Sequence, residues 1–151
     1  MTPNKKRPYP PATVAWKSKR RGTEKFCDLS CRRWTSFTRL GTWVVRDMRG
    51  RPGVLSVHAT GRALDLGYTD RKQALDACEW YVKNNTALGI TLINDYQFGR
   101  YGRTWMCDRQ AWKIHDKETI GTRGNWIHVE LEPWAADDAV GLEKIWRSLP
   151  R

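Results

Sequence analysis

The sequence contains little cysteine and no C-x-x-C pair. It has only Cys27, Cys31, Cys78 and Cys107 in 151 residues. Zinc ribbons need paired cysteines, and disulfide scaffolds are far richer in cysteine, so both classes are excluded. Cys78 falls on the apolar side of a predicted helix. Cys27 and Cys31 are four residues apart, so a helix would place both thiols on one face. The two thiols could then bind one metal ion together, or each could make a contact in the core.

Long apolar runs are also missing. A bilayer-spanning helix needs roughly 18 consecutive apolar residues, and the sequence has no such run. The first residues, MTPNKKRPYPP, are charged but lack the apolar run of a signal peptide. We therefore expect synthesis in a cytoplasm without a signal peptide, and no membrane span. The 40% hydrophobic content and nine tryptophans indicate a folded globule of one domain.

Acidic residues are scarce in the first third of the chain. Residues 1–51 hold 14 Lys and Arg against 3 Asp and Glu, whereas residues 52–151 hold 13 of each kind. This asymmetry favours an anionic partner for the basic segment: nucleic acid, a cell-envelope polymer or an acidic subunit. A solubilising tail is the alternative. Nucleic acid is the weakest of these partners, because no recognition motif and no continuing basic stripe follow.

Proline and hydrophobic periodicity divide the chain in two. Residues 1–12 contain four of the seven prolines and read as an extended arm that a partner orders. We therefore predict a basic N-terminal arm over 1–38, with a helix over 24–37, followed by a domain over 39–151.

The predicted domain mixes strands and helices. Apolar and β-branched residues predict strands over 42–48, 64–68, 90–96, 103–107 and 125–131. A helix over 71–85 begins after Thr69 or Asp70, and a second covers 137–149. The first helix is predicted to bury Ala74, Leu75, Cys78, Tyr81 and Val82. The fold class is α+β, with a small antiparallel sheet packed against flanking helices.

Histidine is also rare, with only three in the chain. In SVHATGRALDLG, His58 and Asp65 flank Gly61 and Ala63, which leave room for the chain to fold back. In NWIHVEL, strand alternation places Trp126, His128 and Glu130 on one face. Catalytic zinc takes three protein ligands and leaves one position open. We therefore predict a metal site of His58, Asp65 and His128, with His115 at the surface or orienting a ligand.

These residues carry a family resemblance. Ser56, His58, Gly61, Ala63 and Asp65 match the S-x-H-x-x-G-x-A-x-D signature, and NWIHVEL is similar to the strand of the third zinc ligand. The sequence thus resembles, over about residues 40–133, the zinc D-Ala-D-Ala carboxypeptidases, whose relatives include phage endolysin L-alanyl-D-glutamate peptidases. The resemblance implies a Hedgehog/DD-peptidase-like fold, a Zn²⁺ cofactor and hydrolysis of a peptide bond in the peptidoglycan stem peptide.

The resemblance also suggests catalytic roles. Arg46 lies roughly where the family has an arginine that steadies the substrate carbonyl, with Arg49 and Arg51 as rivals. The family's general base, an acid three residues before the last histidine, is replaced here by Asn125, which cannot accept a proton. The other candidates for a base are Glu130, Asp95, His115 and Asp116.

Two functions follow as expectations. The first is a zinc peptidase carried in a phage virion, cleaving stem peptides during entry, with the basic arm binding tail subunits. The second is a catalytically weak or inactive structural or cell-wall-binding component of the tail, which the asparagine at position 125 favours.

Overall fold

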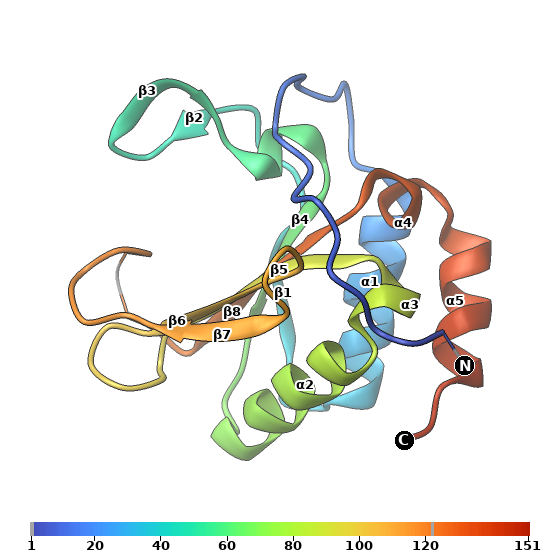
Figure 1. The fold of residues 1–151 in the computed structure, drawn as a ribbon. Helices are drawn as coiled ribbons and strands as arrows, with labels where there is room; N and C mark the ends of the chain where they lie inside the picture. Colours follow the sequence, from blue (N-terminus) through green and yellow to red (C-terminus); the bar gives the residue numbers. More distant parts are fainter. Residues whose placement is uncertain (1, 122) are drawn as a thin grey trace.

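One six-stranded antiparallel sheet organises the protein. A computed structural model describes residues 2–121 and 123–151. The strand order is β1-β4-β8-β5-β6-β7, and two further strands, β2 and β3, form a separate hairpin (Figure 1). The strands are β1 (Thr38–Gly41), β2 (Asp47–Met48), β3 (Arg51–Leu55), β4 (Ala63–Gly67), β5 (Ile90–Asp95), β6 (Arg103–Met106), β7 (Ala111–Ile114) and β8 (Trp126–Leu131).

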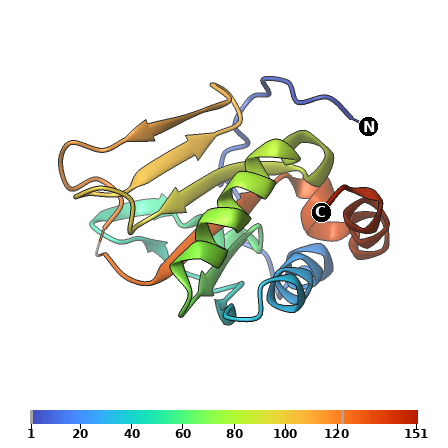
Figure 2. The ribbon, with the colours of Figure 1, turned by 90° about the horizontal axis from the view of Figure 1, so that it is seen from below.

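The helices gather on one side of this sheet. They are α1 (Arg21–Arg33), α2 (Arg71–Lys83), α3 (Asn85–Leu88), α4 (Pro133–Asp137) and α5 (Ala139–Ser148). The short 3₁₀ helix η1 (Val57–Thr60) lies apart from them, beside the β2–β3 hairpin (Figure 1). Figure 2 shows α2 lying across the sheet, with α1 and α5 beside it. The predicted α+β class is therefore confirmed. Within the described residues, no helix has the length and apolar character needed to cross a membrane.

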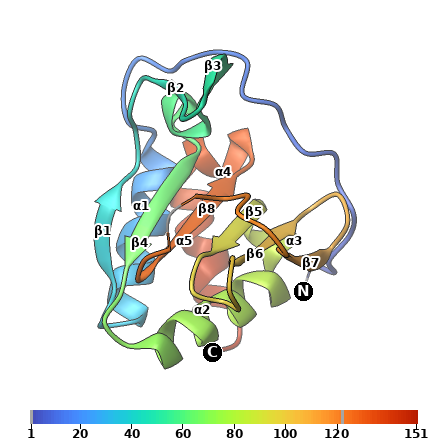
Figure 3. The same cartoon turned by 90° about the vertical axis from the view of Figure 1, so that its left-hand side faces the viewer.

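Strand alternation gives the sheet two chemically different faces. Leu64, Leu66, Ile93, Ile127 and Val129 are fully buried on the face that the helices cover. The intervening positions carry Asp65 on β4 and His128 on β8, together with Asn94 on β5, which pairs with His128 in register. The polar face is turned toward the β2–β3 hairpin (Figure 3). This separation leaves the candidate ligands on the side away from the main core.

Helix α2 agrees closely with its prediction. The Asp70 side chain caps the helix by accepting a hydrogen bond from the Lys72 amide at 2.9 Å. Ala74, Cys78 and Tyr81 are fully buried as expected, but Leu75 is 40% exposed and lies outside the buried stripe. Its place is taken by residues on the other flank of the stripe, Ala77 and Trp80, which contact the core.

Other predicted elements needed correction. The strand expected over 42–48 is reduced to Asp47–Met48, and the preceding Val44 and Val45 are exposed outside any strand. Six elements were not predicted, because they are only four or five residues long and carry little periodic signal: β1, β3, β7, η1, α3 and α4. The strands expected over 64–68, 90–96, 103–107 and 125–131 and the helix over 137–149 are present with slightly different ends.

The largest correction concerns the basic arm. Its helix spans Arg21–Arg33 rather than 24–37, and Phe26 and Cys27 are fully buried in the same core as α2 and α5. Burial raises the pKa of the Cys27 thiol to about 12, consistent with a core contact. Residue 38 is therefore not a boundary between an arm and a separately packed body.

The segment before α1 is also attached to the body, not left for a partner to order. Arg7 forms an ion pair with Glu132, and the buried Arg20 forms one with Asp137. In α1, the Nζ atom of Lys25 lies 3.4 Å from the Oε1 atom of Glu143 and forms a third ion pair. Acidic residues of the last third thus neutralise part of the basic excess of the first third.

Candidate metal centre

The first half of the site is a tight loop whose geometry explains the sequence motif. Ser56 precedes η1, and its hydroxyl accepts a hydrogen bond from the His58 amide at 3.3 Å. Gly61 ends η1 with a φ of +75°, which favours glycine. A Cβ at Gly61 would also lie 2.8 Å from the Cγ and Cδ atoms of Arg20. The loop can therefore return directly into β4 and place His58 beside it.

The second half is a cross-strand pair. Asp65 of β4 lies directly opposite His128 of β8, and Asp65 Oδ1 is 2.9 Å from His128 Nδ1. The other carboxylate oxygen, Oδ2, is 3.1 Å from His58 Nε2. Opposed residues of an antiparallel pair share one face, so the register itself brings this carboxylate and this imidazole together.

The three predicted ligands therefore converge, and this group can hold a metal ion. One donor atom from each of His58, Asp65 and His128 lies within 4.8 Å of the other two. The two imidazole rings are 5.0 Å apart between centroids, and their planes are inclined at 68°. Both histidines are buried, whereas the Asp65 side chain is 21% exposed, so solvent reaches the group from one side. Two nitrogens and one oxygen are a donor set that suits zinc and neighbouring transition metals.

The charges of the group favour a cation at its centre. Burial alone would lower the pKa of His128, but hydrogen bonds to Asp65 and Glu130 outweigh it and raise that pKa to about 10. Burial likewise opposes the ionised form of Asp65, yet the hydrogen bonds to both histidines hold its pKa below the usual range. A site that stabilises an imidazolium in this way is chemically suited to a bound cation.

Glu130 is two residues from His128 on β8 and contacts the ring nitrogen of His128 that does not face Asp65. Its Oε1 atom is 3.0 Å from His128 Nε2, and its Oε2 atom accepts a hydrogen bond from the Tyr9 hydroxyl. Glu130 is only 5% exposed. Ala63, fully buried and directly opposite Glu130, leaves room for the carboxylate. Because both its oxygens are engaged, Glu130 is placed to orient His128.

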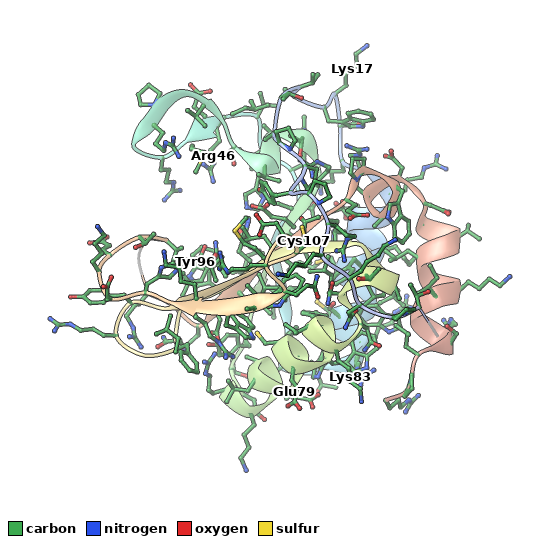
Figure 4. The ribbon with its side chains drawn as sticks, viewed as in Figure 1. Lys17, Arg46, Glu79, Lys83, Tyr96 and Cys107 are labelled. Carbon is green, nitrogen blue, oxygen red and sulfur yellow. The ribbon has the colours of Figure 1, made fainter. Side chains whose placement is uncertain are left out.

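The other residues to which the resemblance assigns catalytic roles, all of them among the residues that the structure describes, form no hydrogen bond or ion pair with His58, Asp65 or His128 through their side chains. Asn125 is exposed just before β8, and its side-chain oxygen accepts a hydrogen bond from Gln97 at 3.0 Å. The backbone carbonyl of Arg46 accepts a hydrogen bond from the amide of Ser56, so Arg46 runs alongside the motif loop. Figure 4 shows Arg46 at the β2–β3 hairpin, where its guanidinium donates to the Asp47 carbonyl. Arg49 and Arg51 are exposed in the same hairpin.

The other proposed bases are placed elsewhere. Asp95 is fully buried on the helix-covered face, where it forms ion pairs with Arg71 and Arg103, so it is not a base for this site. His115 follows β7, and its Nε2 atom lies 2.8 Å from the Thr104 hydroxyl. Thr104 stands two strands away from His128 in the sheet. Asp116 is exposed in the following turn.

Two aromatic residues extend the polar face beyond the ligands. Trp126 begins β8 and stacks on Tyr96 with ring centroids 4.0 Å apart. Burial, and after it the negative charge of Asp65, raises the pKa of the Tyr96 phenol. Tyr96 is labelled in Figure 4. The sequence indicated Trp126 through strand alternation, but nothing in it distinguished Tyr96 from a core tyrosine.

Comparisons with known proteins add no relative. The chain matches no protein-family model, no curated protein and no solved structure. The function of the protein is therefore inferred from the geometry of the site and from the motif residues themselves.

Proposed function

We propose that the protein is a zinc-dependent peptidase that hydrolyses a peptide bond in the stem peptide of bacterial peptidoglycan. The observation that carries the proposal is the convergence of His58, Asp65 and His128 within 4.8 Å. The S-x-H-x-x-G-x-A-x-D resemblance supplies the substrate class. The loop and register contacts support it, because each motif residue has a physical role in building the cluster.

The proposal assigns separate roles to the residues of the site: metal binding, orientation of a ligand and stabilisation of charge on the substrate. His58, Asp65 and His128 would hold the ion, and Glu130 would orient His128. A bound zinc ion supplies Lewis-acid chemistry, polarising a carbonyl and acidifying a bound water. Arg46, next to the motif loop, is the candidate to stabilise negative charge on the substrate oxygen. The exposed edge of Asp65 faces the side from which a substrate would approach.

The second candidate is a metal-binding, peptidase-fold component that turns over slowly or not at all. Two observations favour it: Asn125 stands at the position of the family's base, and Glu130 is already bound by His128 and Tyr9. Loss of a positioned base typically costs about 10²–10⁴-fold in rate. In this second case the protein would still bind the metal ion, but it would serve to bind the cell wall or to form part of a phage tail.

Digestion of purified peptidoglycan separates the two candidates. The zinc-loaded protein should release new amino groups and stem-peptide fragments that mass spectrometry assigns to one bond. His58→Ala should abolish the release, whereas His115→Ala, which alters a histidine that follows β7, three strands from β8, should retain it. A metal-loaded wild-type protein that releases nothing favours the second candidate.

Asn125→Glu provides a further discrimination. If the missing base limits the rate, this change should increase fragment release by at least about tenfold, given the usual contribution of a general base. Asn125→Gln is the matched control, because it lengthens the side chain equally without adding an acid. Equal rates for both variants would show that position 125 does not limit turnover.

Assembly in a phage tail is part of the same proposal and rests on the resemblance together with the basic first third. Lys5, Lys6, Lys17 and Lys19 are exposed and remain accessible to acidic tail subunits, whereas Arg7 and Arg20 are engaged within the chain. Reversing these four lysine charges should prevent incorporation into virions, as measured by immunoblotting of purified particles. Normal incorporation would remove the anchoring role.

A further inference from the structure

The N-terminal segment contributes a side chain to the metal centre from the opposite end of the sequence. The hydroxyl of Tyr9 donates a hydrogen bond to Oε2 of Glu130, whose Oε1 lies 3.0 Å from Nε2 of His128. Tyr9 is separated from Glu130 by 121 positions along the chain. The two contacts form one continuous path from Tyr9 through Glu130 to a candidate ligand.

Two guanidinium groups fix Tyr9 in this place. Before it, the Arg7 side chain bonds Glu132 at 2.6 Å and also donates to the Asn85 and Thr86 side chains. After it, the buried Arg62 donates to the carbonyls of Pro10 and Pro11, each at 3.2 Å. Figure 1 shows the segment running past β5 and α3, where the contacts of Arg7 lie. Tyr9 is therefore held on both sides and does not depend on its own hydroxyl for position.

The contact determines which nitrogen of His128 faces the other ligands. In the structure both ring nitrogens of His128 face carboxylate oxygens, Nδ1 that of Asp65 and Nε2 that of Glu130. A metal ion would replace the proton on Nδ1, and Glu130 would keep the remaining proton on Nε2. A carboxylate can swing about its own side-chain bonds, and the second hydrogen bond from Tyr9 restrains that rotation. Carboxylate partners of this kind raise the basicity of a ligand imidazole and fix its orientation.

We infer that Tyr9 is a positioning residue of the metal centre, acting through Glu130 to hold His128 in its metal-binding tautomer and orientation. The inference rests on the proposed metal centre and adds a residue that no sequence motif contains. It also gives the first twelve residues a role within the site, distinct from anchoring to a partner.

Metal affinity tests this inference without relying on turnover. The full chain and its Tyr9→Phe variant are titrated with Zn²⁺ against a chromophoric chelator, and the Co²⁺-loaded forms are compared by visible absorption. Tyr9→Phe keeps the ring and should weaken Zn²⁺ binding by about tenfold, the lower end of the range for lost outer partners of a ligand. The Co²⁺ bands should shift because the coordination geometry changes. Tyr101→Phe, whose ring packs by Arg100, is the matched control and should leave both readouts unchanged.

A double-mutant cycle shows whether Tyr9 acts through Glu130. Glu130→Ala should weaken Zn²⁺ binding by about 10–100-fold, and Tyr9→Phe should add nothing in that background. Equal losses from Tyr9→Phe in both backgrounds, or wild-type affinity with an unshifted Co²⁺ spectrum, would overturn the inference while leaving the metal centre intact. A wild-type chain that takes up no Zn²⁺ overturns the inference and the proposed function together.

Discussion

Asp65 and His128 stand directly opposite each other on β4 and β8, with Asp65 Oδ1 2.9 Å from His128 Nδ1. This pairing makes the candidate metal centre a property of the sheet itself, because a shift of one residue in either strand would turn one of the two side chains to the helix-covered face. His58 then needs only the short η1 loop to complete the group.

Metal binding should depend on all three of these residues and on no other histidine. We expect the wild-type protein to bind about one equivalent of Zn²⁺, and alanine at His58, Asp65 or His128 to abolish tight binding, because the site has only three protein ligands. Metal analysis after dialysis and calorimetric titration measure this. His115→Ala is the matched control and should bind like wild type.

Removal of the metal should also lower thermal stability. A ligand that binds only the folded state stabilises it by about 2.7 kcal/mol at a concentration 100 times its Kd. Excess Zn²⁺ should therefore raise the melting temperature of wild type, and a chelator should reverse the rise. The His128→Ala variant should show no such response. A similar rise in that variant would indicate zinc binding at another site.

Gly61 should be intolerant of even a methyl group. Gly61→Ala combines a φ of +75° with a Cβ 2.8 Å from Arg20, and Arg20 cannot easily move because it bonds Asp137 and Thr60. Gly53→Ala is a matched control with a φ of +81° and nothing within 4 Å of its Cβ. Positive φ alone costs about 1–2 kcal/mol, so Gly53→Ala should stay within that range.

The difference between the two glycine variants isolates the close approach of Arg20. Chemical denaturation should show Gly61→Ala losing more stability than Gly53→Ala by at least about 1 kcal/mol, since a clash adds to the backbone strain. Gly61→Ala should also weaken metal binding, because the loop carries His58. Equal stability losses would mean that Arg20 relaxes and that only the φ angle selects glycine here.

Asp95 tests the distinction between a structural acid and a catalytic one. Removing one partner of a buried ion pair costs about 3–5 kcal/mol, because the remaining charges lose their counterion. We expect Asp95→Ala to approach this loss, since its carboxylate is fully buried between Arg71 and Arg103. Zinc stoichiometry should remain unchanged. Asp116→Ala, an exposed acid, should change the unfolding free energy by less than about 0.5 kcal/mol.

The sequence predicted the convergence of the three candidate ligands because short-range signals specified much of it. His58, Gly61 and Asp65 fall within eight positions, so local loop geometry brings the first two ligands together. Strand alternation then placed His128 and Glu130 on one face of β8, as the structure shows. The opposition of β4 and β8 was not predictable, because strand register is decided by long-range packing rather than by either strand alone.

The sequence did not predict the structural roles of Tyr9, Asp95 and the basic segment, because these roles depend on contacts between distant parts of the chain. Tyr9 lies in a proline-rich stretch with no periodicity, and only its contact with Glu130 reveals a role. Asp95 resembled a candidate base in the sequence, yet alternation along β5 puts it on the face opposite Asn94 and His128. The excess of basic residues in 1–51 likewise suggested a detached arm. A count of charges cannot show that Glu132 and Asp137 pair with two of these basic residues, Arg7 and Arg20.

The core role of α1 can be tested by a single truncation of a side chain. Phe26 is fully buried, with its ring centroid 5.2 Å from that of Tyr81 and 5.4 Å from that of Trp146. Replacing a buried phenylalanine with alanine costs about 3–5 kcal/mol. Phe26→Ala should therefore remove a large share of the about 5–15 kcal/mol by which a typical domain is stable, as measured by urea denaturation.

Val14→Ala is the control for that experiment, because Val14 lies in the same N-terminal third but is 68% exposed. Its unfolding free energy should remain within about 0.5 kcal/mol of wild type. If Phe26→Ala were equally mild, α1 would be a separable appendage, and deleting residues 1–38 should leave a folded body. The packing of Phe26 between α2 and α5 argues for the opposite outcome, in which that deletion exposes the core and the shortened chain fails to fold.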